Sequence, residues 1–176
     1  MTSRARWSAS SPSLNSKGKT LLRVYFYDAP PATGVVTNPL DGKPHNLSGT
    51  EEHARKTRLL QALELQPDFA LRSGETVVRG WELGAAANRS LRRELRTLVA
   101  EDLVPHIKQR GVDLRIGLDI ARLSLRQLVE IIVVMTGDRD MLPAFKFARR
   151  EGVRVYLDTM GHGVRRHLMP RVDIVL

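Results

Sequence analysis

The stretch that decides the fold runs from Val133 to Asp140 and reads Val-Val-Met-Thr-Gly-Asp-Arg-Asp. It ends an apolar, β-branched run that begins at Ile131, and such a run is typical of a strand buried on both faces of a parallel sheet. Asp138 and Asp140 follow at the carboxyl end of this strand, where ligands bind in open α/β sheets. Two carboxylates so close together favour a divalent cation between them. The alternative is that Asp140 only caps the next helix and that Asp138 is solvated.

Strand and helix signals alternate around this stretch, which predicts an α/β fold with a mainly parallel sheet flanked by helices. Apolar side chains in residues 112–125 alternate as in a strand up to Ile120, and they also form a helical stripe. A helix is predicted, because the alternation fails after Ile120 and a parallel sheet needs a long crossover before its next strand. Downstream, a helix is expected at 141–150, and strands are expected at 153–157 and 173–176.

Upstream of residue 112 the signals are shorter and depend more on turn residues. Ser48 and Glu51 have the spacing of a capping box, so a helix is expected from there to about residue 65. The other predicted elements are a strand at 21–27, a hairpin of 69–72 and 76–83, a helix at about 90–100 and a basic turn at 108–111. Residues 1–20 are predicted as a disordered basic tail, and residues 21–176 as one domain.

The charge of the chain favours an anionic partner. The 176 residues include 28 Lys and Arg against 19 Asp and Glu, which gives a formal net charge of +9. Nucleic acid is the commonest partner of so basic a protein. Aromatic residues make up only 5% of the chain, so contacts to phosphate are expected to outweigh base stacking.

The composition also excludes several kinds of site. Because the chain has no cysteine, it can form neither disulfides nor thiolate metal sites, which is compatible with a cytoplasmic protein. No apolar run approaches the roughly 20 residues of a membrane span, and residues 1–20 lack the apolar core of a secretory signal.

A third carboxylate can join the pair that follows the strand. On the predicted helix, Asp119 lies beside Ile120 at the margin of the apolar face, where a charge needs a partner. Asp119, Asp138 and Asp140 can converge on one sheet edge, and three carboxylates together need cations to neutralise them. Mg²⁺ or Mn²⁺ suits such oxygen ligands, and a metal held there can activate water and stabilise charge on a phosphodiester. Chemistry and charge therefore both favour a metal-dependent enzyme acting on nucleic acid.

The order and spacing of several motifs also resemble the NYN domain. The motifs are Gln109 to Asp113, Asp119, Thr136 to Asp140, Pro143, Lys146, and Arg149 to Val153. Residues 25–30 resemble the family's second strand, and residues 69–83 are similar to an inserted β-hairpin. The likeness extends over residues 21–176 and is strongest at 108–157. It implies a PIN-like, metal-dependent ribonuclease with a Rossmann-like fold.

The resemblance also implies roles for particular residues. Asp119, Asp138 and Asp140 match acidic metal-site positions, which implies that they are catalytic and bind Mg²⁺ or Mn²⁺. Asp113 and Thr136 match supporting positions.

The chain departs from the family pattern at two places. The family's first strand, which is central in its sheet and ends in a further aspartate of the metal cluster, has no counterpart in residues 1–20. A misplaced start or a degenerate copy would explain this difference. Met141 replaces a phenylalanine that the family commonly has, and this substitution keeps the volume.

The remaining charged candidates have simpler explanations than catalysis. Several basic side chains either contact nucleic acid or form solvated faces; they are Lys146, Arg149, Arg150, Arg165 and Arg166. Asp28 and Asp158 end strands and are expected to form turns. Glu130 precedes the strand at 131–135 and so lies at its wrong end for catalysis.

Three functions are compatible with these observations. The first is a divalent-metal-dependent endoribonuclease, a hydrolase that uses metal-activated water, with RNA favoured over DNA as its substrate. The second is a non-catalytic RNA-binding or regulatory module that has lost its first aspartate. A Toprim-like site ranks last, because that fold wants a glutamate after an earlier strand, where this chain has Asp28.

Overall fold

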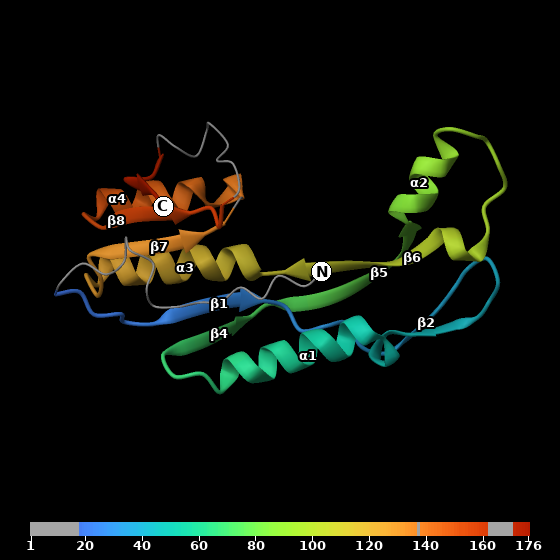
Figure 1. Cartoon of the computed structure of the whole chain (residues 1–176), viewed down its shortest axis with the longest axis horizontal. Coiled ribbons are helices and arrows are strands. Elements are labelled where there is room, and N and C mark those ends of the chain that lie inside the picture. Colours follow the sequence, from blue (N-terminus) through green and yellow to red (C-terminus); the bar gives the residue numbers. More distant parts are fainter. Residues whose placement is uncertain (1–17, 137, 162–170) are drawn as a thin grey trace. The chain divides into compact units, whose positions relative to one another are not determined.

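The structure is a computed structural model that describes residues 18–136, 138–161 and 171–176. Most of the predicted basic tail at residues 1–20 therefore lies outside the described residues. Helices and strands alternate along the chain, which confirms the predicted α/β class (Figure 1). The chain divides into two compact units. We call Tyr25–Ile116 the N-terminal unit, and Gly117–Leu176 together with Met1–Val24 the C-terminal unit.

A three-stranded parallel sheet forms the centre of the C-terminal unit. Its strands are β7 (Ile131–Met135), β8 (Arg154–Asp158) and β9 (Ile174–Val175), in that order across the sheet. In the register of β7 and β8, Ile131 pairs with Arg154 and Met135 pairs with Asp158. All three strands were predicted, each within one or two residues of its bounds. Their parallel pairing aligns the carboxyl ends of β7 and β8 at one edge of the sheet.

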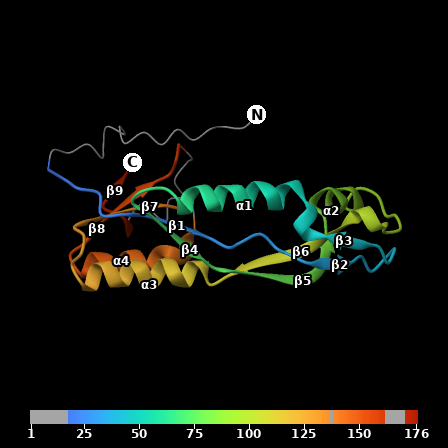
Figure 2. The same cartoon turned by 90° about the horizontal axis from the view of Figure 1, so that it is seen from below.

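Two helices cover one face of this sheet, as Figure 2 shows. They are α3 (Val112–Leu125), which begins in the N-terminal unit, and α4 (Leu142–Arg150). The prediction of a helix at 112–125 is thus confirmed. Ile120 and Leu123 of α3 are buried, and on α4 Phe145 and Ala148 are fully buried. The apolar face of each helix therefore supplies the core of the unit.

The strand β7 is less buried than its sequence predicts. All of its residues are half-buried, whereas Val155 and Leu157 of β8 are fully buried. Within the described residues β7 hydrogen-bonds to β8 alone, so it is an edge strand of this sheet. The expectation of a strand buried on both faces was wrong in this respect, because a central position belongs to β8.

The N-terminal unit is built from strand pairs and two helices. The pairs are β1 (Val24–Asp28) with β4 (Phe69–Ser73), β2 (Val35–Thr37) with β3 (Pro44–Asn46), and β5 (Glu75–Leu83) with β6 (Leu103–Arg110). The second and third pairs are antiparallel, and a bulge lies between Val78 and Trp81 of β5. The helices are α1 (Glu51–Glu64) and α2 (Ala85–Leu91). Two of the three strand pairs of this unit are thus antiparallel, whereas the three-stranded sheet of the C-terminal unit is parallel.

The predicted hairpin at 69–83 was wrong. Only Gly74 separates β4 from β5, and the two strands pair with different partners. At this junction the Gly74 N–H donates to the Asp28 carbonyl at 2.8 Å. A Cβ at Gly74 would lie 2.6 Å from the Arg110 carbonyl oxygen, so only glycine lets β6 approach this closely. Strand β5 instead pairs antiparallel with β6, across a connection that contains α2.

Three other local predictions also needed correction. The helix expected at about 90–100 is found earlier in the chain. It begins in the run Ala85 to Ala87 and ends at Leu91. No turn forms at 108–110, where a basic turn was expected, because these residues are the last part of strand β6. Helix α1 is capped by Thr50 rather than Ser48, and the Thr50 hydroxyl accepts the His53 N–H at 3.1 Å.

No helix within the described part of the chain has the length and apolar character needed to cross a membrane.

Candidate active site

The loop after β7 is held by hydrogen bonds between the predicted site residues. The Thr136 hydroxyl oxygen accepts the Asp138 N–H at 3.0 Å. Oδ1 of Asp138 in turn accepts the Asp140 N–H at 2.9 Å, in the manner of a helix cap. A short 3₁₀ turn, η3 (Arg139–Met141), then leads into α4. The structure thus brings Thr136, Asp138 and Asp140 together, with both carboxylates exposed.

These bonds correct the capping alternative drawn from the sequence. Asp138, not Asp140, makes the cap bond, and it does so at η3. The N-cap of α4 itself is Met141, which makes no side-chain cap bond. The cap bond uses Oδ1 of Asp138, and each carboxylate oxygen can accept more than one bond. Capping and metal binding are therefore compatible at Asp138.

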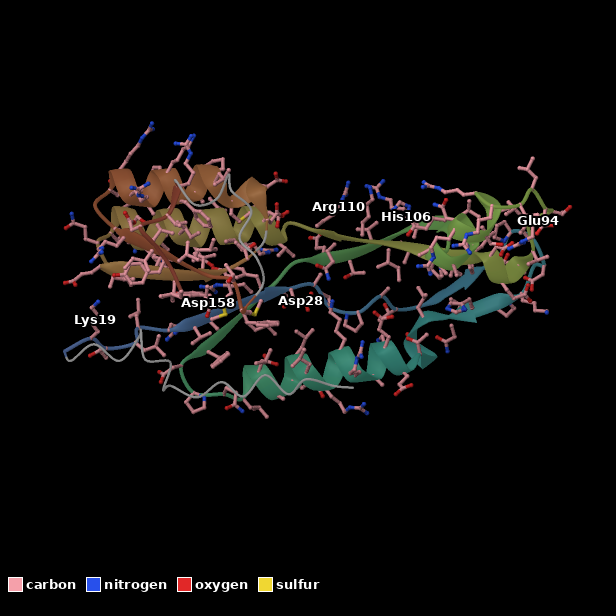
Figure 3. All side chains as sticks on the ribbon, turned by 45° about the horizontal axis from the view of Figure 1, so that its top comes forward. Lys19, Asp28, Glu94, His106, Arg110 and Asp158 are labelled. Carbon is pink, nitrogen blue, oxygen red and sulfur yellow. The ribbon has the colours of Figure 1, made fainter. Side chains whose placement is uncertain are left out.

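Asp158 places another carboxylate at the same edge of the sheet. Asp158 (labelled in Figure 3) ends β8. It pairs in register with Met135, the last residue of β7. Its Oδ1 accepts the Met160 N–H at 2.8 Å, so it forms a turn as the sequence predicts. Sequence reasoning treated it as a turn former only. The signal that could have found it is the pairing of parallel strands, which brings residues at two strand ends together.

The other predicted acidic residues lie on α3. Asp119 is half-buried and precedes the buried Ile120, so it lies at the margin of the apolar face as expected. Asp113 is exposed in the first turn of α3 and belongs to the N-terminal unit. Among residues 18–136, 138–161 and 171–176, no three Asp, Glu or His side chains lie close enough to hold a metal ion. The described residues thus contain no ready-made three-carboxylate cage.

The donors that are present nevertheless fit Mg²⁺ or Mn²⁺ in one particular way. Mg²⁺ usually keeps several waters and is bound through one or two carboxylates together with substrate phosphates. Asp138 and Asp140 are exposed oxygen donors two residues apart at a strand end, which matches that kind of site. The positive end of the following helical segment also favours negative charge at this position.

Asp28, in the N-terminal unit, has a structural partner. Its Oδ1 accepts Lys56 Nζ at 2.8 Å, Gln109 Nε2 at 2.9 Å and the Ala29 N–H at 2.7 Å. The bonds from Lys56 and Gln109 tie the end of β1 to α1 and β6. The bonds to the carboxylate explain Asp28 without a catalytic role.

The predicted nucleic-acid contacts are divided between described and undescribed residues. Lys146, Arg149 and Arg150 are exposed on α4. Arg165 and Arg166 lie outside the described residues.

Comparison with known families agrees with the resemblance seen in the motifs. No curated protein and no solved structure shows significant similarity to the chain. The family model described as NYN domain matches residues 77–168, just over half of the chain. The match includes β7, the loop with Asp138 and Asp140, and α4. The chain therefore belongs to the NYN domain family, which is a PIN-like nuclease family.

Proposed function

We propose that this protein is a metal-dependent endoribonuclease that hydrolyses phosphodiester bonds at the carboxyl edge of β7. The observation that carries the proposal is the Thr136–Asp138–Asp140 bond chain, which presents two exposed carboxylates at the end of a parallel strand. Membership of a PIN-like nuclease family supports the reaction class. The formal charge of +9 supports a polyanionic substrate.

Asp138 and Asp140 would hold Mg²⁺ or Mn²⁺. Asp119 is the third acidic residue that the family resemblance implies, but among the described residues it forms no three-carboxylate group with them. When bound, the metal would lower the pKa of a coordinated water and neutralise charge on the phosphodiester. Water and the substrate phosphate would complete the coordination, because the described residues supply no cage of three carboxylates.

The chain's own residues have separate tasks in this proposal. Thr136 fixes the loop through the Asp138 N–H and is a positioning residue, as its hydroxyl bond is to the backbone. Asp138 orients Asp140 through the cap bond while presenting its own carboxylate. Lys146, on the exposed face of α4, would bind a phosphate of the substrate backbone.

We further propose RNA as the substrate and the cytoplasm as the place of action. The family supports RNA, because the NYN domain resembles PIN-like ribonucleases, and a chain without cysteine is compatible with a reducing compartment.

The test is Asp138→Asn, measured as cleavage of a fluorescent single-stranded RNA with Mg²⁺ or Mn²⁺. The amide keeps an oxygen that can accept the Asp140 N–H but loses the charge that binds metal. Cleavage is expected to fall by about 100-fold or more, with unchanged circular dichroism and unchanged RNA binding in EDTA. The matched control is Glu130→Gln, an exposed carboxylate at the start of β7, which should cleave at the wild-type rate.

A second pair of variants tests the positioning role of Thr136. Thr136→Val removes the acceptor of the Asp138 N–H, whereas Thr136→Ser keeps it. The kcat of the valine variant should fall by about 10- to 100-fold, and the serine variant should keep the wild-type kcat.

Wild-type cleavage by Asp138→Asn at the same metal concentration would overturn the proposal.

The second candidate function is a non-catalytic RNA-binding module. It is favoured by one observation, namely that no three-carboxylate metal group occurs among the described residues. It predicts salt-sensitive RNA binding without turnover in any divalent metal.

A further inference from the structure

A basic groove lies in the C-terminal unit, at the opposite edge of the sheet from Asp138 and Asp140. Its volume is about 550 Å³. We call it the amino-edge groove, since Arg154 at its wall is the first residue of β8, whereas Asp158 at the candidate active site is the last. Its charged lining residues are Lys146, Arg149, Arg150, Arg154, Arg171 and Asp173. Five of these side chains are cationic and one is anionic.

The cations come from three separate segments. Lys146, Arg149 and Arg150 are three and four residues apart on the exposed face of α4, so their like charges repel one another. The helix dipole favours Arg149 and Arg150 in the last turn but accounts for neither Arg154 nor Arg171. Gly152, with φ of +85°, follows the C-cap of α4, and the chain enters β8 at Arg154 two residues later. This convergence of positive charge, which exceeds that of the one carboxylate present, favours an anion in the groove.

Asp173 orients one of these cations and does not serve only to cancel charge. Its Oδ1 accepts Nε of Arg149 at 3.1 Å, and its Oδ2 accepts the Val155 N–H at 2.7 Å. The Asp173 N–H donates to the Val155 carbonyl at 2.8 Å. Both carboxylate oxygens are therefore bonded within the protein. Since the bond to Arg149 involves Nε, it leaves the two terminal nitrogens of the guanidinium outside that contact.

Arg154 is held at the wall of the groove by an aromatic ring. Its guanidinium carbon lies 5.4 Å from the centroid of the Tyr156 ring, which is a cation–π distance. Tyr156 itself is only 7% exposed, so its ring is not available to stack on a base. Among the described residues that line the groove there is no aromatic side chain. The groove is thus suited to phosphate and not to recognition of bases.

We propose that the amino-edge groove binds the phosphodiester backbone of the nucleic-acid strand several nucleotides away from the cleaved bond. The choice of nucleic acid as ligand rests on the proposed function. Helix α4 has nine residues and separates the two edges of the sheet, which corresponds to about 14 Å. At about 3.4 Å of helical rise per nucleotide, this distance spans about four nucleotides. A strand whose scissile phosphate lies at the candidate active site therefore reaches the groove only if it extends about four nucleotides beyond that bond.

The experiment measures RNA binding by fluorescence anisotropy in EDTA, so that cleavage plays no part. The test variant is the triple replacement Arg150→Gln, Arg154→Gln and Arg171→Gln. The matched control removes three exposed arginines of the N-terminal unit: Arg55→Gln, Arg58→Gln and Arg93→Gln. If the triple test variant loses its circular dichroism signal, Arg150→Gln with Arg171→Gln replaces it, because this pair keeps the contact to Tyr156.

The groove variant should bind a 12-nucleotide RNA on the order of tenfold more weakly at 0.1 M salt. The slope of log K against log salt should become shallower by about 2, as three contacts at about 0.7 each are lost. A 3-nucleotide RNA should lose less affinity in the groove variant than the 12-nucleotide RNA, because it can contact fewer of the three arginines at once. The control triple should leave the slope for the 12-nucleotide RNA close to that of the wild type.

Several outcomes would refute the proposed role of the amino-edge groove. Equal losses in the test and control triples would mean that net charge, and not the groove, sets the affinity. An unchanged slope in the groove variant would exclude phosphate contacts there. Groove-dependent binding of inorganic phosphate or ADP as tight as that of the 12-nucleotide RNA would assign the site to small phosphates. Equal groove-dependent competition by polyglutamate of the same charge would assign it to an acidic protein. A chain that never cleaves RNA would refute the proposed function yet still show the groove-dependent binding.

Discussion

Among single residues, Asp102 shows how one carboxylate can organise a turn. It is buried at 7% exposure, and its two oxygens accept Nη1 and Nη2 of Arg96 at 2.6 Å each. Oδ2 also accepts the Val99 N–H at 3.0 Å. The bonds from Arg96 and then from Val99 lower the pKa of Asp102 from 3.8 to about 2, although burial opposes this shift.

This lowered pKa predicts acid sensitivity of the N-terminal unit. Because the folded-state pKa lies below the unfolded one, the contribution of Asp102 to stability is complete above about pH 4 and is lost as the pH falls towards 2. Asp102→Asn should lower the Tm at pH 7. Between pH 5 and pH 2, its Tm should fall less than the Tm of the wild type. Thermal melts followed by circular dichroism measure both effects. The neighbouring Glu101→Gln should follow the wild-type curve, and parallel curves for wild type and Asp102→Asn would contradict the prediction.

The candidate site residues differ in how far the sequence could identify them. Asp138 and Asp140 are adjacent to a strand end in the sequence, so their proximity follows from local structure. The role of Thr136 depends on a hydroxyl bond that spacing alone does not specify. Asp158 becomes a site neighbour only through the pairing of β8 with β7. Asp119 is distant in sequence, and its place in a metal site stays a prediction.

At the scale of elements, the junction of β4 and β5 explains why hairpin prediction failed. Ser73-Gly74 between two apolar runs has the composition of a turn. The chain instead runs from β4 into β5 without folding back on itself. The two strands pair with different partners, β4 with β1 and β5 with β6. Strand partners are chosen by long-range pairing, which turn propensity does not encode.

Two glycines are expected to respond in opposite ways to alanine. A Cβ at Gly74 would lie 2.6 Å from the Arg110 carbonyl oxygen and 2.7 Å from a methyl group of Val112, so the backbone must shift. Gly74→Ala should destabilise the protein by about 1–3 kcal/mol. In the described part of the chain a Cβ at Gly117 meets nothing within 4 Å, and Gly117→Ala should stabilise helix α3 by about 0.5–1 kcal/mol. Urea unfolding of both variants measures the change in the free energy of unfolding. A Gly74→Ala protein with the wild-type free energy of unfolding would refute the close packing at Gly74.

At the scale of the whole molecule, charge should govern affinity and metal should govern turnover. With a formal charge of +9, RNA binding should weaken by on the order of 300-fold between about 50 and about 200 mM salt, if about six phosphates are contacted. EDTA should abolish cleavage but leave this binding unchanged, because the phosphate contacts are made by Lys and Arg. Anisotropy and gel-based cleavage assays on the same sample measure the two effects. RNA binding that requires the divalent metal would contradict this separation.

The helices and strands of the C-terminal unit were predictable because each is specified by its own residues. The uninterrupted β-branched run of β7 and the helical stripe of α3 are local patterns. The order of the strands is not local, so the half-buried state of β7 and the central position of β8 appeared only in the folded unit.

The amino-acid sequence by itself determined the α/β class, the basic charge, the pair of aspartates after β7 and the family. These depend on composition and on residues that are near one another in the chain. Only the tertiary structure decided that Asp158 joins the same edge, and that basic side chains from α4, β8 and the segment before β9 line one groove. The physical reason is that strand pairing and helix packing bring distant residues together, and the spacing along the chain does not record which ones will meet.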